Sequence, residues 1–193
     1  MKKNKQKILV TGGSGFIGSA ITNYLVDEGH LVTVFDNNSR GKIRGISKNI
    51  KKIKFVKGDI RDYKKLKSIK SNFDTVIHLA YVNGTKFFYK KPLEILDIAT
   101  NGMLNILKFS KEKKVKNFYL ASSSEVYQNP IRFPTDEREM LKIPNIHNPR
   151  YSYGGGKIFS ELYGIHFAKK YFKKFIIFRP HNVYGKDMGN DHV

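Results

Sequence analysis

The stretch that decides the fold is residues 7–18, Lys-Ile-Leu-Val-Thr-Gly-Gly-Ser-Gly-Phe-Ile-Gly. A short apolar run meets a glycine-rich turn and an apolar-periodic stretch follows, so we expect a strand, a tight turn and a helix. Gly12 permits the turn, Gly15 lets a pyrophosphate approach backbone N–H groups, and Gly18 lets the helix pack closely on the strand. The helix dipole then favours the phosphates. The spacing predicts a dinucleotide site, with a purely structural turn as the alternative.

An acidic residue at the end of the second expected strand supports the dinucleotide interpretation. Asp36 lies 18 residues after Gly18. A carboxylate at that distance is placed to bond the ribose hydroxyls of the cofactor, which favours NAD over NADP. Arg40 follows four residues later and is the residue that would soften this preference.

The composition is that of one globular α/β domain covering residues 1–193. Hydrophobic residues make up 40% of the chain, and the absence of cysteine excludes disulfides and thiolate chemistry. The N-terminus is basic, but glycines interrupt the apolar stretch that follows. We therefore expect neither a signal peptide nor a membrane span, and a cytoplasmic location.

The formal net charge of +20 raises the question of nucleic-acid binding. Of the 36 basic residues, seven are Arg and 29 are Lys, scattered along the chain. Arginine is the preferred residue for bidentate recognition of bases and phosphates. We therefore expect no specific nucleic-acid partner, although weak binding at low salt would follow from the charge alone.

Apolar runs alternate with helical patterns along the whole chain. We expect strands at 8–11, 31–36, 53–57, 75–79, 117–121 and 175–178. We expect helices at 16–28, 62–70, 93–112 and 153–172, with a short helix in part of 41–50. This alternation predicts an α/β fold with a doubly wound parallel sheet of the Rossmann type. Ligands of such sheets bind at the carboxyl ends of the strands.

The ends of the third and fourth strands carry candidate cofactor contacts. Asp59 is placed to meet the adenine end of the cofactor, while Asp62 is a candidate N-cap of the next helix. His78 lies in an apolar run, where we expect a buried structural histidine rather than a catalytic one. Leu79 and Ala80 offer small apolar backbone beside the cofactor.

Three further segments are candidates for the reacting end of the site. The polar and aromatic loop 82–91 has a position from which it would face a substrate. Residues 122–127 place three hydroxyls and a carboxylate at a strand end, where a capping role is the alternative. Tyr153 and Lys157 share one helix face, and a nearby ammonium favours the phenolate; a solvated surface pair is the alternative. The glycines at 154–156 cost helix stability, which suggests close approach to another element or ligand.

Together these residues resemble the extended short-chain dehydrogenase/reductase family, the NAD-dependent nucleotide-sugar epimerases and dehydratases. The resemblance runs from Lys7 to the last residues of the chain. The motifs that carry it are, in chain order, 11–18, Asp36-Asn37, Asp59-Ile60, His78-Leu79-Ala80, Asn101-Gly102, 122–127, Tyr153 with Lys157, and 179–185.

The resemblance implies a mechanism with NAD as the cofactor. Tyr153 takes the proton of a sugar hydroxyl as hydride passes to the nicotinamide. Lys157 holds the nicotinamide ribose and lowers the pKa of Tyr153, and Ser123 bonds the reacting hydroxyl. A 4-ketosugar forms, and NAD is regenerated in the same site. The implied cofactor-binding residues are Gly12, Gly15, Phe16, Ile17, Gly18, Asp36, Asn37, Asp59, Ile60, Leu79, Ala80, Asn101, Tyr153, Lys157 and Pro180. The implied substrate-binding residues are Asn83, Ser124 and Asn182.

The step after oxidation is left open by the resemblance. An activity like that of UDP-glucose 4-epimerases is the first expectation. Glu125 is a candidate catalytic acid or base, which would suit a UDP-glucuronate decarboxylase or a nucleotide-sugar 4,6-dehydratase; alternatively, it braces its loop. Ser124 stands where deoxysugar dehydratases carry Asp, which argues against a strict dehydratase. A non-catalytic dinucleotide- or RNA-binding relative is the alternative outside enzymes.

The resemblance also bears on the partners of the protein and on a domain that we expect to be largely absent from this chain. The family continues into a smaller C-terminal domain that encloses the substrate, and this chain stops at Val193, so we expect that domain to be largely absent. The activity of the 193-residue chain alone is therefore open. We expect a nucleotide-sugar substrate, no membrane partner and no metal, and association into a homodimer stays open.

Overall fold

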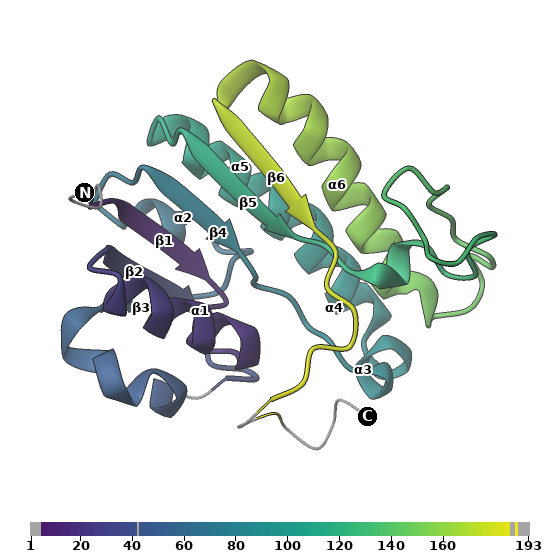
Figure 1. Ribbon diagram of the computed structural model, residues 1–193, viewed down its shortest axis with the longest axis horizontal. Helices are drawn as coiled ribbons and strands as arrows, with labels where there is room; N and C mark the ends of the chain where they lie inside the picture. The colour runs from purple at the N-terminus through teal and green to yellow at the C-terminus, as the bar shows by residue number, and fades with distance from the viewer. Residues whose placement is uncertain (1–4, 42, 186–187, 189–193) are drawn as a thin grey trace.

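Six strands form one parallel sheet in the order β3-β2-β1-β4-β5-β6 (Figure 1). The computed structural model describes residues 5–41, 43–185 and 188. The strands are β1 (Lys7–Thr11), β2 (Leu31–Asp36), β3 (Lys54–Lys57), β4 (Thr75–His78), β5 (Asn117–Ala121) and β6 (Lys174–Phe178). The strand order changes direction between β1 and β4, which confirms the predicted doubly wound sheet.

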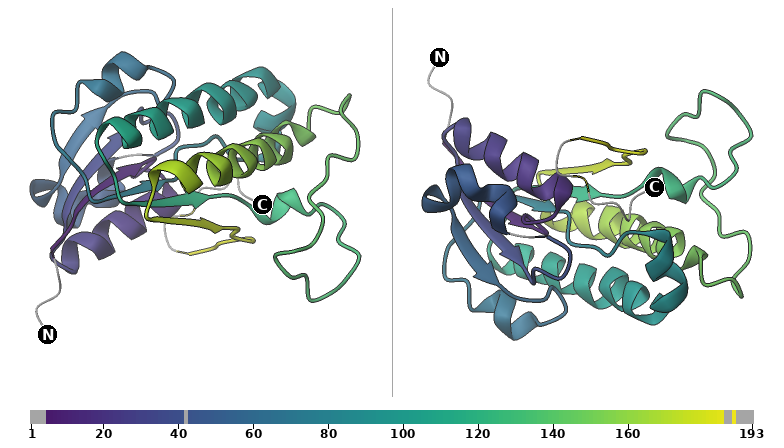
Figure 2. Two further views of the ribbon diagram at one scale, coloured as in Figure 1. Left: turned by 90° about the horizontal axis from the view of Figure 1, so that it is seen from above. Right: turned by 90° about the horizontal axis from the view of Figure 1, so that it is seen from below.

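Helices cover both faces of the sheet (Figure 2). The longer ones are α1 (Phe16–Asp27), α5 (Met103–Glu112) and α6 (Tyr151–Tyr171). The shorter ones are α2 (Tyr63–Lys67), α3 (Thr85–Lys90), α4 (Pro92–Asp97) and the 3₁₀ helices η1 (Ile43–Lys52) and η3 (Ser124–Val126). Figure 2 shows α1 on one side of the sheet and the pair α5 and α6 on the other. No helix in the described part of the chain is both long and apolar enough to cross a bilayer.

The structure differs from the predicted elements at two places near the fourth strand. The single helix expected at 93–112 is α4, a π-helical turn η2 (Ile98–Gly102) and α5. The loop expected at 82–91 contains α3, which begins after Gly84 at a φ of 118°. Only glycine adopts such a φ readily, so Gly84 lets the chain turn sharply into α3. The mixture of polar and aromatic residues in this segment gave no helical pattern from which α3 could be predicted.

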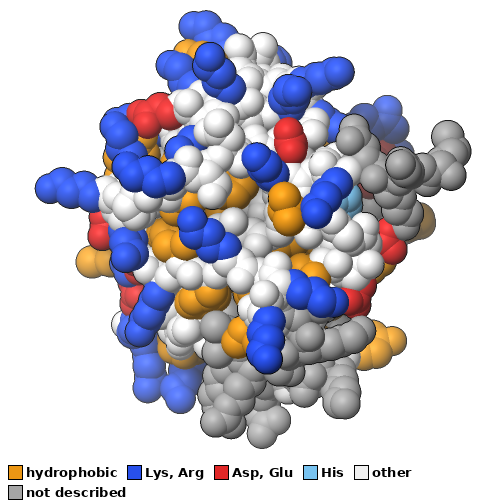
Figure 3. Space-filling view, turned by 90° about the vertical axis from the view of Figure 1, so that its left-hand side faces the viewer, with side chains coloured by type: hydrophobic (Ala, Val, Ile, Leu, Met, Phe, Trp, Pro, Cys, Tyr) orange, Lys and Arg blue, Asp and Glu red, His pale blue; other side chains and the backbone are white. Residues whose placement is uncertain are grey.

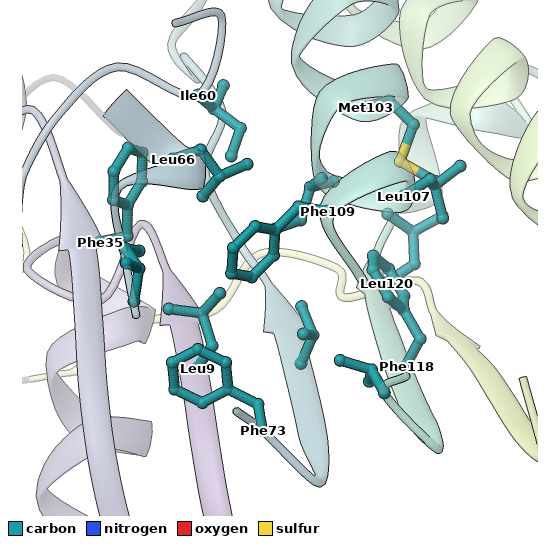
Figure 4. Close-up of a cluster of buried hydrophobic side chains, with 14 of the residues drawn as sticks. Leu9, Phe35, Ile60, Leu66, Phe73, Met103, Leu107, Phe109, Phe118 and Leu120 are labelled. Atoms are coloured by element: carbon teal, nitrogen blue, oxygen red, sulfur yellow. The ribbon is translucent and has the colours of Figure 1, made fainter. Parts of the chain in front are cut away.

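Two layers of apolar side chains sandwich the sheet, because successive residues of a strand point to opposite faces. Leu9 and Phe35 pack with Phe109 and Phe118 on the side of α2 and α5 (Figure 4). Val10 and Val34, their neighbours in sequence, pack on the opposite side. This packing fixes the carboxyl ends of the strands relative to one another, and the candidate site lies at those ends.

Basic side chains are spread over the face of the molecule that Figure 3 shows. On the face shown in Figure 3, lysine and arginine side chains are separated by apolar and polar ones rather than gathered in one stripe. A dispersed charge of this kind supports weak electrostatic attraction but defines no recognition surface on that face.

Candidate active site

The glycine turn between β1 and α1 has the close contacts that its spacing predicts. Gly12 has a φ of 72°, and a Cβ there would lie 2.6 Å from the backbone nitrogen of Ala80. A Cβ on Gly18 would lie 2.0 Å from the carbonyl oxygen of Gly12. At Gly15 the nearest atom to a Cβ would be 3.4 Å away, so the backbone there is open to a ligand. Among the residues that the structure describes, no side chain caps the first turn of α1, which begins at Phe16.

Asp36 is fixed against this turn at the end of β2. Its carboxylate accepts hydrogen bonds from the backbone N–H of Ser14, at 3.0 Å, and of Asn38, at 2.8 Å. The amide of Asn37 donates to Asp59 over 3.1 Å, so the ends of β2 and β3 are joined. The structure therefore brings Asp36, Asn37 and Asp59 to one edge of the glycine turn, where the sequence predicts the adenosine end of a cofactor.

An ion-pair network surrounds Asp59. The Arg61 guanidinium donates to both carboxylate oxygens, at 2.9 and 2.8 Å, and holds the pKa of Asp59 at about 2. Arg61 also reaches Asp97 at 3.3 Å, and the Asn101 amide donates to Asp97 over 2.5 Å, which ties the π-helical turn to this network. Asp62 caps α2 by accepting from the Lys65 N–H at 3.0 Å, as predicted.

His78 is a structural histidine, as expected. It is buried, and its Nδ1 forms a 2.7 Å hydrogen bond with the Thr11 hydroxyl on the neighbouring strand. Burial first, and the nearby Lys157 charge second, lower the pKa of His78 to about 3. Leu79 donates to the Thr11 carbonyl at 3.0 Å, which sets the chain of Leu79 and Ala80 beside the glycine turn.

Tyr153 and Lys157 are buried, so the alternative of a solvated surface pair is wrong. The Tyr153 side chain is 6% exposed and its ring stacks on Phe88 with the centroids 4.7 Å apart. The Lys157 ammonium donates to the carbonyl of Ala121, at the end of β5, over 2.8 Å. Ser123 is also buried, and its hydroxyl lowers the pKa of Tyr153. The predicted Ser, Tyr and Lys therefore meet at one strand end.

The electrostatics of this pair differ from the sequence expectation. Burial raises the pKa of Tyr153 to about 12, against the lowering effect of the nearby Ser123 hydroxyl. Burial lowers the pKa of Lys157 to about 7. The Lys157 nitrogen lies 5.7 Å from the Tyr153 ring centroid, and its charge does not overcome the cost of burying a phenolate.

The glycines that begin α6 allow close approach, as their helix cost suggested. A Cβ on Gly156 would lie 2.3 Å from the Tyr81 hydroxyl and 2.7 Å from the Ala99 side chain. A Cβ on Gly154 would lie 3.1 Å from the Glu125 carbonyl oxygen. Because these glycines lack a side chain, helix α6 can pack closely on the segments that follow β4 and β5.

We expect Gly156→Ala to destabilise the protein and Gly155→Ala to leave it as stable or more so. At Gly156 the overpacking cost of about 1–3 kcal/mol outweighs the gain of about 1 kcal/mol in helix propensity. At Gly155 a Cβ would meet the Ile143 side chain at 3.1 Å, and Ile143 is 43% exposed and able to move. The free energy of unfolding of both variants in urea checks this. If Gly156→Ala were as stable as the unaltered protein, the residues around Gly156 would be able to move aside without cost.

Glu125 lies next to the Ser and Tyr residues and is held by an arginine. The Arg150 guanidinium approaches both Glu125 carboxylate oxygens, at 3.4 and 3.5 Å, and both side chains are about one-third exposed. The Glu125 N–H donates to the Ser123 hydroxyl at 3.2 Å. This placement fits either a reactive carboxylate or a brace for the segment, so both interpretations of Glu125 stay predictions.

The residues predicted to bind the substrate do not form one buried cluster like that of Ser123, Tyr153 and Lys157. Ser124 donates its N–H to the Pro180 carbonyl at 3.1 Å, which links η3 to the segment after β6. Asn83 is exposed and its side chain accepts from the Gly84 N–H at 2.8 Å. Asn182 is exposed, with a left-handed φ of 39°. The roles of these three residues in binding a substrate remain predictions.

Sequence reasoning missed the buried ion pair that locks α6 to the end of β6. The Arg179 guanidinium binds the Glu161 carboxylate through two hydrogen bonds, of 2.9 and 2.6 Å, and donates to the Tyr127 hydroxyl at 2.6 Å. A signal for it was present: Tyr153, Lys157 and Glu161 follow at intervals of four residues, on one helix face.

Comparison with known proteins agrees with this geometry. The family model described as NAD dependent epimerase/dehydratase family matches residues 8–193. The chain is 32% identical over 191 residues to a UDP-glucose 4-epimerase of Halalkalibacterium halodurans, covering 96% of this chain and 54% of that protein. It is 30% identical over 187 residues to UDP-glucuronic acid decarboxylase 1 of Danio rerio, covering 97% of this chain and 44% of that protein.

A solved structure shares the fold. The UDP-glucose 4-epimerase of Bifidobacterium longum, in complex with NAD⁺ and UDP, matches with a TM-score of 0.78 at 30% identity, over 90% of this chain and 52% of that one. The chain thus spans about half the length of the proteins it matches. The glycine turn, the acidic end of β2 and the Ser, Tyr and Lys residues follow one another in the order of the family. Since the family model matches almost every residue, the chain belongs to the NAD dependent epimerase/dehydratase family.

Proposed function

We propose that the protein acts on a nucleotide sugar as a UDP-glucose 4-epimerase does, through a 4-ketosugar and with NAD as its cofactor. The observation that carries the proposal is the buried cluster of Ser123, Tyr153 and Lys157 at the end of β5. A protein that only binds a dinucleotide gains nothing from enclosing a tyrosine and a lysine together, since burying the ammonium is costly.

The residues around the glycine turn fit NAD. The open backbone at Gly15 and the uncapped first turn of α1 suit a pyrophosphate, and the Asp36 carboxylate suits ribose hydroxyls. Asn37, Asp59, Ile60, Leu79, Ala80, Asn101 and Pro180 complete the proposed set. When bound, NAD accepts the hydride from C4 of the sugar and returns it.

In the proposed cycle Tyr153 takes the proton of the C4 hydroxyl, and Ser123 orients that hydroxyl. A base works best with a pKa near the working pH, and burial holds the pKa of Tyr153 at about 12. The Lys157 ammonium is the group in place to stabilise the phenolate. Because the pKa of Lys157 is about 7, its charge is lost as pH rises through neutrality. Its supply of positive charge is therefore pH-dependent.

A second candidate function is decarboxylation of a UDP-uronate, or dehydration. The position of Glu125, whose N–H donates to the Ser123 hydroxyl at 3.2 Å, favours it, because a carboxylate beside Ser123 suits acid–base work on the carbon next to a 4-keto group. Matches to both epimerases and a decarboxylase at similar identity leave the choice to experiment.

Incubating the protein with NAD and either UDP-glucose or UDP-glucuronate tests the proposal, with chromatography of the nucleotide sugars as readout. We expect interconversion of UDP-glucose and its C4 epimer. Conversion of UDP-glucuronate with release of CO₂ would instead support the decarboxylase. No turnover of either sugar, together with RNA binding that persists at physiological salt, would favour the non-catalytic alternative.

We expect the protein to bind NAD more tightly than NADP, and Asp36→Ala to erode that preference. The variant removes a charged acceptor for the ribose hydroxyls and for the Ser14 and Asn38 N–H groups, so NAD affinity should fall by roughly 10–100-fold. Asp62→Ala is the matched control, because Asp62 caps α2 away from the glycine turn. Calorimetry showing equal or tighter NADP binding to the unaltered protein would overturn the assignment.

A further inference from the structure

Tyr81, two residues beyond Leu79, enters the Ser, Tyr and Lys cluster from the end of β4. Its ring centroid lies 3.8 Å from the Lys157 nitrogen. The same ring meets the Tyr153 ring edge-on, with the centroids 5.2 Å apart and an interplanar angle of 89°. Tyr81 therefore contacts both members of the proposed proton-transfer pair.

The contribution of Tyr81 comes from its ring rather than its hydroxyl. The hydroxyl is enclosed, and among the described residues it has no hydrogen-bond partner. It points at Gly156, where an added Cβ would lie 2.3 Å away. Because Gly156 has no side chain, helix α6 leaves room for Tyr81, whose ring then lies against the Lys157 ammonium. A buried hydroxyl without a partner is costly, whereas the ring contacts both Lys157 and Tyr153.

Burial lowers the pKa of Lys157, and the Glu161 carboxylate raises it. The ammonium donates to the Ala121 carbonyl at 2.8 Å. The acid that faces it, Glu161 on its own helix, is bound by the Arg179 guanidinium at 2.9 and 2.6 Å. His78 faces it from β4, with its pKa lowered to about 3, and is neutral. Tyr153, the other titratable group beside it, is a neutral phenol at physiological pH.

We propose that Tyr81 is a positioning residue that holds the Lys157 ammonium on its ring face, in its charged form, beside Tyr153. A cation within about 6 Å of an aromatic centroid is attracted by the ring quadrupole, and more strongly when both are desolvated. The ring opposes the effect of burial on Lys157 and keeps positive charge where a phenolate would form. The role of that charge in the reaction rests on the proposed function; the contact itself does not.

The test follows the titration of Lys157 in the protein without cofactor or substrate. With ¹³C-labelled lysine, the Lys157 side chain should titrate near its pKa of about 7, apart from the exposed lysines, and Lys157→Arg identifies its resonance. Nonsense suppression then places phenylalanine, difluorophenylalanine and pentafluorophenylalanine at position 81. These side chains keep the shape of the ring while they weaken its quadrupole stepwise.

We expect the pKa of Lys157 to stay close to its starting value with phenylalanine and to fall by about one pH unit across the fluorinated series. The same series at Tyr171, whose ring lies 4.4 Å from the Lys111 nitrogen, should leave the Lys157 titration unchanged. A Lys157 pKa that does not follow fluorination at position 81 would overturn the proposal. Because no turnover is measured, this outcome is independent of whether the protein is an epimerase.

Discussion

Tyr153→Phe should lower the turnover of a nucleotide sugar by roughly 10²–10⁴-fold while leaving the affinity for NAD nearly unchanged. The substitution keeps the ring that stacks on Phe88 at 4.7 Å and meets Tyr81 at 5.2 Å. It removes the Tyr153 hydroxyl, which is the proposed acceptor of the sugar proton and whose pKa the nearby Ser123 lowers. Initial rates and calorimetry with NAD measure the two effects separately.

Tyr163→Phe provides the control for this experiment. Tyr163 lies on the same helix but is 41% exposed, so the loss of its hydroxyl should change neither quantity. If Tyr153→Phe turned over substrate at the unaltered rate, Tyr153 would not be the base. If NAD affinity fell in parallel with the rate, the hydroxyl would act in cofactor binding rather than in the chemical step.

The geometry of the glycine turn and of Asp36 could be predicted closely from the sequence because its determinants are local. Gly12, Gly15 and Gly18 lie within seven residues that join β1 to α1, and Asp36 ends the next strand, so spacing alone places them at one edge of a parallel sheet. The Asp62 cap and the buried His78 were predictable for the same reason. In each case a few neighbouring residues determine the outcome.

The parts that escaped prediction depend on distant partners. The π-helical turn at Ile98–Gly102 lies inside an unbroken helical pattern, and Ser160 of α6 packs against it with its hydroxyl 3.3 Å from the Ala99 carbonyl. The pairing of Glu161 with Arg179 joins residues 18 positions apart through the packing of α6 on β6. The periodicity of a sequence predicts which residues share one face of a helix, but not which residues elsewhere in the chain pack against that face.

The pKa of Tyr153 shows the same limit in chemical terms. The spacing of Tyr153 and Lys157 puts them on one helix face, from which a lowered tyrosine pKa was expected. The spacing carries no information on solvation, and both side chains are buried. Burial raises the pKa of Tyr153 to about 12 and lowers that of Lys157 to about 7. The two pKa values, both ordinarily near 10, therefore move apart, and burial favours the neutral form of each group.

Glu125→Gln separates the two enzymatic proposals. Epimerisation at C4 needs removal and return of a hydride, with Tyr153 handling the proton, and requires no second carboxylate. Decarboxylation or dehydration needs acid–base control at the carbon beside the 4-keto group. If Glu125 supplies it, the variant should slow product formation by at least about 10²-fold while hydride transfer to NAD continues. Reduced cofactor should then accumulate and be visible by its absorbance.

The alternative, that Glu125 only braces its segment through Arg150, predicts a different pattern. Arg150→Met would then lower stability and turnover together with Glu125→Gln, because each breaks the same 3.4 Å ion pair, and no reduced cofactor would build up. Glu137→Gln, which removes an exposed carboxylate from the neighbouring loop, is the control for loss of charge alone. Accumulation of reduced cofactor in Glu125→Gln but not in Arg150→Met would assign the carboxylate to the chemistry. Unchanged turnover in Glu125→Gln would leave 4-epimerisation as the preferred activity, because the decarboxylase and the dehydratase both need that second acid.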